Sequence, residues 1–164
     1  MMTRTIGNLL ALLAACGLFA LPATAQSVVR TELETVRVVT LTQGLEHPWG
    51  LAFLPDGRML VTERPGRLRI VGKDGKLAPQ AVAGVPPVGE LGQGGLLDVA
   101  LHPDFRANSL IYLSYTGEGP GGYSTEVARA RFVEGDGAAR LEDVRVIFRQ
   151  GPKSRGGRHF GSRL

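Results

Sequence analysis

The sequence predicts an all-β fold of the β-propeller type, and three observations lead to that prediction. Beyond residue 25, no stretch shows a sustained apolar period of 3.6 residues, so little helix is expected. Short β-rich segments are instead separated by glycine, proline and Asp-Gly pairs. A motif of two apolar strands joined by a Pro-Asp turn occurs twice, and Pro55 and Pro103 lie 48 residues apart. A four-stranded repeat of about 40 to 50 residues is typical of one propeller blade.

Eight strands are expected in chain order from the apolar and β-branched segments. They cover residues 36–41, 50–53, 59–63, 68–71, 97–101, 110–115, 126–132 and 144–149. The pairs Asp56-Gly57, Asp74-Gly75 and Asp136-Gly137 lie between or beside these segments. Asp-Gly suits a tight hairpin turn, because glycine adopts a positive φ without a steric penalty. Many strands with short connections indicate an antiparallel sheet architecture.

Residues 1–25 are expected to be a secretory signal peptide rather than part of the fold. Arg4 precedes an apolar stretch at residues 9–20, and Ala23-Thr24-Ala25 offers a small-x-small cleavage site. The apolar stretch is well short of the roughly 20 residues that span a bilayer, so no stable membrane insertion is expected. An alternative is a lipoprotein anchored at Cys16, since residues 13–16 resemble a lipoprotein box. We therefore expect a periplasmic or secreted bacterial protein.

Cysteine content and charge exclude several classes of function. Cys16 is the only cysteine, so a chain cleaved after Ala25 has neither disulfides nor thiol chemistry. The formal net charge is +4, and no acidic residue follows Asp143. A basic C-terminal segment can meet nucleic acid, an anionic surface or an anionic cofactor, and the export signal argues against nucleic acid. The three separated histidines give no zinc pattern, and no calcium-loop spacing is present.

Three segments resemble a known family in their order and spacing. They are GLEHPWGLAFLPDGRMLVTERPGRLRIV, then GQGGLLDVALHPDFRANSLIYLSYT, then RHFGSRL. Together they resemble the soluble periplasmic aldose sugar dehydrogenases that use pyrroloquinoline quinone (PQQ), relatives of soluble quinoprotein glucose dehydrogenase. The resemblance covers residues 33–164 and implies a six-bladed propeller with the quinone on its central face. Calcium is also implied, through residues beyond Leu164.

The resemblance also implies roles for individual residues. His159, in the segment Arg158–Leu164, would be the general base that takes a proton from the sugar's anomeric hydroxyl, and the ordinary histidine pKa near 6.5 suits this task. Gln93 of the GQGGLL motif would contact the substrate. Arg158 stands where the glucose dehydrogenases have an aspartate. A cation there would either disfavour the protonated form of the neighbouring histidine or help to hold the anionic cofactor, and the sequence does not choose between these two effects. Trp49 is interpreted as blade packing.

The repeat period predicts how much of a propeller the chain supplies. Residues 26–164 correspond to about two blades and the first strand of a third at residues 162–164, so the chain is expected to be the N-terminal portion of a longer protein and inactive alone. The partners expected are a small-molecule sugar, an unidentified electron acceptor and a second subunit in a homodimer, but no nucleic acid. The alternatives are a six-bladed propeller hydrolase of the lactonase type and a non-catalytic secreted propeller that binds a ligand.

Overall fold

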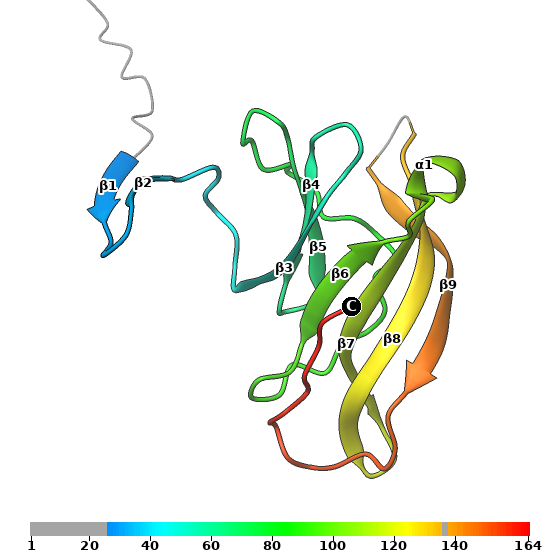
Figure 1. Ribbon diagram of the computed structural model, residues 1–164. Coiled ribbons are helices and arrows are strands. Elements are labelled where there is room, and N and C mark those ends of the chain that lie inside the picture. The colour runs from blue at the N-terminus through cyan, green and yellow to red at the C-terminus, as the bar shows by residue number, and fades with distance from the viewer. Residues whose placement is uncertain (1–25, 136–137) are drawn as a thin grey trace, which may run out of the picture. The chain divides into compact units, whose positions relative to one another are not determined.

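The computed structural model describes residues 26–135 and 138–164 (Figure 1). Its elements in chain order are β1 (Gln26–Arg30), β2 (Thr35–Val39), β3 (Pro48–Phe53), β4 (Met59–Glu63), β5 (Arg67–Val71), β6 (Leu96–Leu101), α1 (Phe105–Asn108), β7 (Leu110–Gly119), β8 (Gly122–Val133) and β9 (Arg140–Arg149). The chain divides into two compact units, with the boundary between Val39 and Thr40. No helix in the described ranges is long and apolar enough to cross a membrane.

The first unit contains an antiparallel hairpin of β1 and β2. Its strands pair from Gln26 with Val39 to Arg30 with Thr35. At the turn, the Thr31 hydroxyl donates to the Glu34 carbonyl oxygen at 2.8 Å. The predicted strand at residues 36–41 corresponds to β2, but β1 was not predicted, because its residues follow directly on the cleavage site of the expected signal peptide.

The second unit contains two antiparallel sheets that lie side by side, with β6 packed against β3 and β4 (Figure 1). One sheet has the order β3-β4-β5 and the other the order β6-β7-β8-β9. Four antiparallel strands paired in chain order form the architecture of a propeller blade. The prediction of an all-β, propeller-type fold is therefore confirmed.

Both sheets repeat the same irregularity on their first strand. The register shifts between Pro48 and Leu51 in β3, and between Leu96 and Val99 in β6. At each shift, a main-chain N–H donates to a hydroxyl on the next strand. In β3, the Gly50 N–H donates to Thr62 Oγ1 at 2.8 Å. In β6, Asp98 donates to Ser114 Oγ at 3.0 Å. The Pro-Asp repeat thus corresponds to a repeated strand, bulge and turn.

The core is formed mainly by aliphatic side chains from the facing surfaces of the two sheets. The largest fully buried ones are Leu60, Leu68, Leu96, Leu97, Ile111 and Leu113. The exposed aromatic and aliphatic residues include Trp49, Leu51 and Phe53 of β3. The interpretation of Trp49 as a packed residue is wrong for this chain, since 44% of its surface is accessible.

Six of the other predicted strands match β3 to β8 closely, and the seventh corresponds to the second half of β9. The predicted strand at residues 162–164 is wrong, because these residues have no regular structure. Positive φ angles at His159, Gly161 and Ser162 prevent an extended conformation here. The main-chain N–H of Leu164 instead donates to Asp98 Oδ2 at 2.7 Å. The predicted signal peptide, Cys16 and the Asp136-Gly137 turn lie outside the described residues.

Candidate functional site

A cleft of about 340 Å³ brings together residues from the two sheets and the C-terminal segment. Trp49 lies on β3, Arg64 follows β4, and Gln93 precedes β6. The full lining is Trp49, Arg64, Gln93, Leu97, His159, Phe160 and Gly161. The cleft therefore contains two of the three predicted site residues, Gln93 and His159, although 66 positions separate them.

Hydrogen bonds hold the main chain at His159 and at the residue that follows it. The His159 N–H donates to Gln93 Oε1 at 3.1 Å. The carbonyl oxygen of Phe160 accepts a hydrogen bond of 2.5 Å from Thr125 Oγ1. Phe160 is buried, whereas His159 is exposed at the cleft. A φ of 62° is unfavourable for a residue with a Cβ, so the surrounding contacts must hold this conformation.

Gln93 contacts the histidine segment through both its main chain and its side chain. Its N–H donates to the Gly157 carbonyl oxygen at 2.8 Å. A Cβ at Gly92 would collide with the same oxygen, so the two loops approach as closely as glycine permits. Because Gln93 Oε1 already accepts from His159, the amide nitrogen of the side chain stays available as a donor toward the cleft.

Arg64 connects the first sheet to the Gln93 loop. Its Nη1 donates to the Gly92 carbonyl oxygen at 2.8 Å. The main chain of Arg64 is also held, because its N–H donates to His47 and its carbonyl accepts from Leu96. Neither Arg64 nor Trp49 was predicted from the sequence to be a site residue. The only signal in the sequence was position: Arg64 lies beside a Pro-Gly turn, and Trp49 lies at the start of a strand.

A buried ion pair anchors the start of the C-terminal segment. Lys153 Nζ donates to Glu126 Oε1 at 2.8 Å, to the Gly117 carbonyl at 2.8 Å and to Ser124 Oγ at 3.0 Å. Burial raises the pKa of the Glu126 carboxyl, but the hydrogen bonds and charges of Lys153, Tyr115 and Arg149 together outweigh it, so the net pKa is lowered. Burial, with the neighbouring Glu126 carboxylate, raises the pKa of Tyr115 to about 12.

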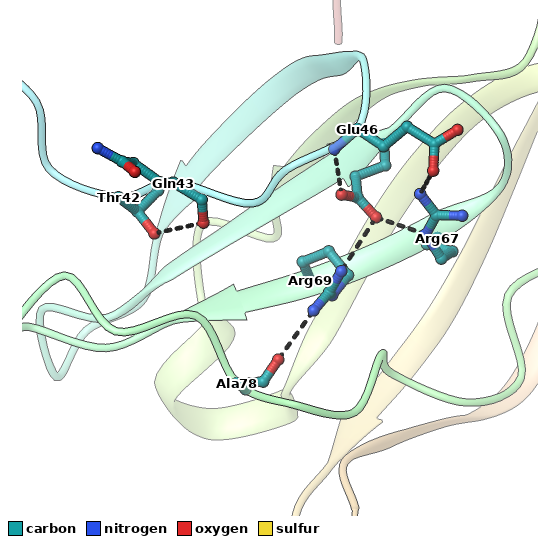
Figure 2. Close-up of polar contacts among 7 residues, drawn as sticks. Thr42, Gln43, Glu46, Arg67, Arg69 and Ala78 are labelled. Atoms are coloured by element: carbon teal, nitrogen blue, oxygen red, sulfur yellow. Dashed lines mark hydrogen bonds and ion pairs between the residues drawn. The ribbon is translucent and has the colours of Figure 1, made fainter.

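A second buried carboxylate, Glu63, is fully occupied by structural contacts, and its donors Glu46, Arg67 and Arg69 are labelled in Figure 2. It accepts hydrogen bonds of 2.6 Å from the Glu46 N–H and from Arg67 Nε, and one of 3.3 Å from Arg69. Arg69 also donates to the Ala78 carbonyl oxygen. Burial raises the pKa of the Glu63 carboxyl, but these donors outweigh it and the net pKa is lowered. Glu63 therefore serves the fold and is not free to act as a catalytic acid or base.

Arg158 is adjacent to His159, but it is exposed and does not line the cleft. Its role toward the cofactor remains a prediction. Within residues 26–135 and 138–164, no group of three or more His, Cys, Asp or Glu side chains is arranged to hold a metal ion. The lining combines an aromatic ring, an arginine, an amide and an imidazole with no carboxylate. This set of groups fits one edge of an anionic, planar cofactor such as PQQ.

Comparison with known proteins establishes the family. The sequence profile described as Glucose / Sorbosone dehydrogenase matches residues 45–164. The chain belongs to this family.

Several members of the family, including some with solved structures, are similar to this chain over most of its length. Aldose sugar dehydrogenase YliI of Escherichia coli is 47% identical over 132 residues, which are 79% of this chain and 35% of the relative. The apo-form crystal structure of the soluble aldose sugar dehydrogenase from the same organism has a TM-score of 0.67, covering 73% of this chain and 34% of that one. The PQQ-bound aldose sugar dehydrogenase from Streptomyces coelicolor is 31% identical with a TM-score of 0.60, covering 81% and 37%. The chain therefore spans about a third of the length of these relatives.

Proposed function

We propose that the protein carrying this chain oxidises aldose sugars to lactones with PQQ, and that His159 is the general base. The observation that carries the proposal is the cleft in which His159 and Gln93 meet. The PQQ-bound Streptomyces relative supports the choice of cofactor.

In the proposed reaction, the His159 imidazole accepts the proton of the anomeric hydroxyl as the C1–H bond breaks. The electron pair of that bond leaves as hydride, and the C1–O bond becomes the carbonyl of the lactone. PQQ, when bound, supplies the two-electron acceptor that receives the hydride. The sugar thus loses two electrons and two protons, one proton to the histidine and one within the hydride.

Gln93 and the cleft walls would orient the sugar for this step. The free amide nitrogen of Gln93 can donate to a sugar oxygen while its carbonyl oxygen holds the His159 main chain. The ring of Trp49 offers an apolar face for the sugar ring, and it is the only tryptophan in the chain. Arg158, outside the cleft, would attract an anionic cofactor to this face of the protein.

The activity belongs to the whole protein, since this chain spans about a third of its relatives. We propose that the isolated 164-residue chain shows no turnover, because most of the cofactor pocket lies in later blades. Calcium would bind through residues beyond Leu164. Export to the periplasm, or secretion, follows from the predicted signal peptide. The electron acceptor and any homodimer are further parts of the proposal.

The test compares two histidines that share a left-handed main chain, His159 with φ 62° and His47 with φ 47°. Asparagine tolerates this conformation, so His159→Asn and His47→Asn preserve the local backbone. In the full-length protein loaded with PQQ, His159→Asn should lower kcat at least about 100-fold, because a general base contributes on the order of 10²–10⁴. PQQ binding, followed by equilibrium dialysis, should change less than about twofold. A His159→Asn enzyme with near wild-type kcat would exclude His159 as the base.

A further inference from the structure

The peptide unit between Gly92 and Gln93 is hydrogen-bonded at both of its polar ends. Its carbonyl oxygen accepts from Arg64 Nη1 at 2.8 Å. Its N–H donates to the Gly157 carbonyl oxygen at 2.8 Å. Because a peptide unit is planar, an interaction that fixes the direction of the carbonyl also fixes the direction of the N–H.

We propose that Arg64 is a positioning residue for His159. Its guanidinium fixes the Gly92–Gln93 peptide, and that peptide, together with the Gln93 side chain, fixes the main chain of the histidine segment. The inference rests on the proposed function, since it assigns Arg64 to the same site. We call this chain of contacts, Arg64 to Gly92–Gln93 to Gly157 and His159, the arginine clamp.

The charge of Arg64 strengthens the clamp beyond the single bond that it makes. A hydrogen bond from a charged donor is roughly twice as strong as one between neutral groups. A cation on a peptide carbonyl also polarises the amide, which makes its N–H a better donor to the Gly157 oxygen. Both effects reach the Gly157 carbonyl through one rigid peptide unit, and the Gln93 side chain carries the contact on to the His159 N–H.

The base of Arg64 is rigid, as a positioning role requires. Its N–H donates to the His47 carbonyl at 3.1 Å, and its carbonyl accepts from the Leu96 N–H at 2.9 Å. Gly95 has a φ of 139°, and a Cβ there would collide with the Arg64 carbonyl oxygen. Since no carboxylate lines the cleft, no residue of the lining competes with the Gly92 carbonyl for the guanidinium.

The contact between the two loops combines hydrogen bonds with one apolar side chain, that of Leu91. A Cβ on Gly157 would lie 3.1 Å from Leu91 Cγ and 3.3 Å from the Gly92 Cα. Little apolar surface is buried between the two glycines themselves, so hydrogen bonds act beside the Leu91 contact in setting their separation. The histidine also holds an unfavourable φ of 62°, which makes it sensitive to any loosening of the clamp.

The experiment uses full-length protein with three substitutions. Arg64→Gln removes the charged donor, Arg64→Lys keeps a charge and one donor for the Gly92 carbonyl, and Arg106→Gln is the matched control. Arg106 makes the same type of bond, from Nη2 to the Pro55 carbonyl at 3.2 Å, outside the cleft lining. Hydrogen exchange by mass spectrometry is measured for residues 155–161, with β7 as the internal reference, alongside kcat and KM.

We expect Arg64→Gln to raise the exchange rate of residues 155–161 about tenfold, with β7 unchanged, and to lower kcat about tenfold with KM within threefold. Arg64→Lys should restore both quantities to within about threefold of wild type, and Arg106→Gln should leave both within twofold. Where Arg64→Gln folds poorly, Arg64→Met keeps the aliphatic stem and gives the same measurement. These values follow from the loss of one charge-assisted hydrogen bond, about 1.4 kcal/mol for tenfold.

Exchange in residues 155–161 that stays within twofold of wild type in the Gln and Met variants would overturn the clamp. Equal acceleration in β7 would also overturn it, since Arg64 would then serve global stability only. The proposed function is tested separately: if exchange accelerates as expected but His159→Asn retains turnover, the clamp stands and the base assignment fails.

Discussion

The side-chain carbonyl oxygen of Gln93 accepts a hydrogen bond from the main-chain N–H of His159 at 3.1 Å. An N–H donor requires an acceptor, so this contact fixes which end of the amide faces the histidine. The nitrogen end is left to face the cleft. Gln93 therefore offers two separable groups, an oxygen that holds the His159 main chain and a nitrogen for the proposed contact with the sugar.

Substitution of Gln93 can separate these two roles. Gln93→Glu keeps an acceptor for the His159 N–H and removes the amide donor. We expect hydrogen exchange of residues 155–161 to stay within about twofold of wild type, while KM for the sugar rises about tenfold, the value of one lost hydrogen bond. Exchange is measured by mass spectrometry and KM by steady-state kinetics of the full-length protein.

Gln93→Ala is the matched variant that removes both groups, and it should accelerate exchange in residues 155–161 about tenfold as well as raise KM. If Gln93→Glu and Gln93→Ala accelerate exchange equally, the side-chain oxygen does not hold the histidine segment.

The close approach of the two loops predicts that Gly92 does not tolerate a side chain. Gly92 has a φ of 59°, and its Cβ would collide with the Gly157 carbonyl oxygen. Gly92→Ala should cost about 1 kcal/mol for the left-handed backbone alone, and it should also displace the Gly157 carbonyl. We expect kcat to fall at least about tenfold.

Gly156→Ala provides the control within the same segment. Its φ is not positive, and a Cβ there would meet only Ser154 Oγ at 3.8 Å, an ordinary contact. Stability by urea unfolding and kcat should both stay near wild type. Equal losses in Gly92→Ala and Gly156→Ala would mean that the segment responds to any alanine and not to the collision.

The strands and their turns were predictable because each depends on local patterns. Alternating apolar residues and Asp-Gly pairs placed most strands to within a few residues, and the 48-residue repeat of Pro55 and Pro103 indicated the blades. The pairing of Gln93 with His159 followed from family resemblance, since no periodic pattern relates residues 66 positions apart. The strand expected at residues 162–164 was wrong, because the repeat period on which it rested does not reveal the positive φ of Ser162.

The arginine clamp could not be predicted, because its main contacts use backbone groups. Every residue has a carbonyl and all but proline an N–H, so the sequence does not say that Gly92 accepts from Arg64. Trp49 was misassigned for a different reason. An aromatic residue on an apolar strand is usually packed, and only the neighbouring sheets determine which face of β3 is covered.

The hydroxyl of Thr62 joins the two sheets, and its loss should destabilise the protein. Thr62 is fully buried, accepts from the Gly50 N–H at 2.8 Å and donates to the Leu97 carbonyl at 2.5 Å. Thr62→Val conserves shape but leaves both main-chain groups unpaired, so the free energy of unfolding should fall by about 2 kcal/mol. Thr62→Ser keeps the hydroxyl and should lose about 1 kcal/mol, from the deleted methyl group. Urea unfolding of both variants measures the difference, and a smaller loss in Thr62→Val than in Thr62→Ser would contradict the role of the hydroxyl.

The ion pair of Glu126 and Lys153 predicts how stability depends on pH. The Glu126 carboxyl has a folded pKa below its ordinary value of 4.5, because Lys153, with Tyr115 and Arg149, outweighs the effect of burial. A carboxyl with a lowered pKa stabilises the folded protein fully above its ordinary pKa, and the contribution is lost as the pH falls through the folded pKa. Wild-type unfolding free energy should therefore decrease from about pH 6 to about pH 3. The decrease should be smaller in Glu126→Gln, although the Glu63 carboxyl, whose pKa is also lowered, retains part of it.

Removal of the lysine gives the complementary result at neutral pH. Lys153→Met removes the nearer cation of the Glu126 carboxylate and leaves only Arg149, at 3.5 Å, so the free energy of unfolding should fall by up to about 3 kcal/mol. The double variant Glu126→Gln/Lys153→Met removes both charges and should recover part of this loss, because no buried charge is then left unpaired. Urea unfolding of the wild type, the two single variants and the double variant, at pH 7 and at pH 4, gives the four free energies of unfolding that form the double-mutant cycle. If the double variant is as unstable as the sum of the two single variants, the two side chains act independently and the ion pair does not anchor the segment that carries His159.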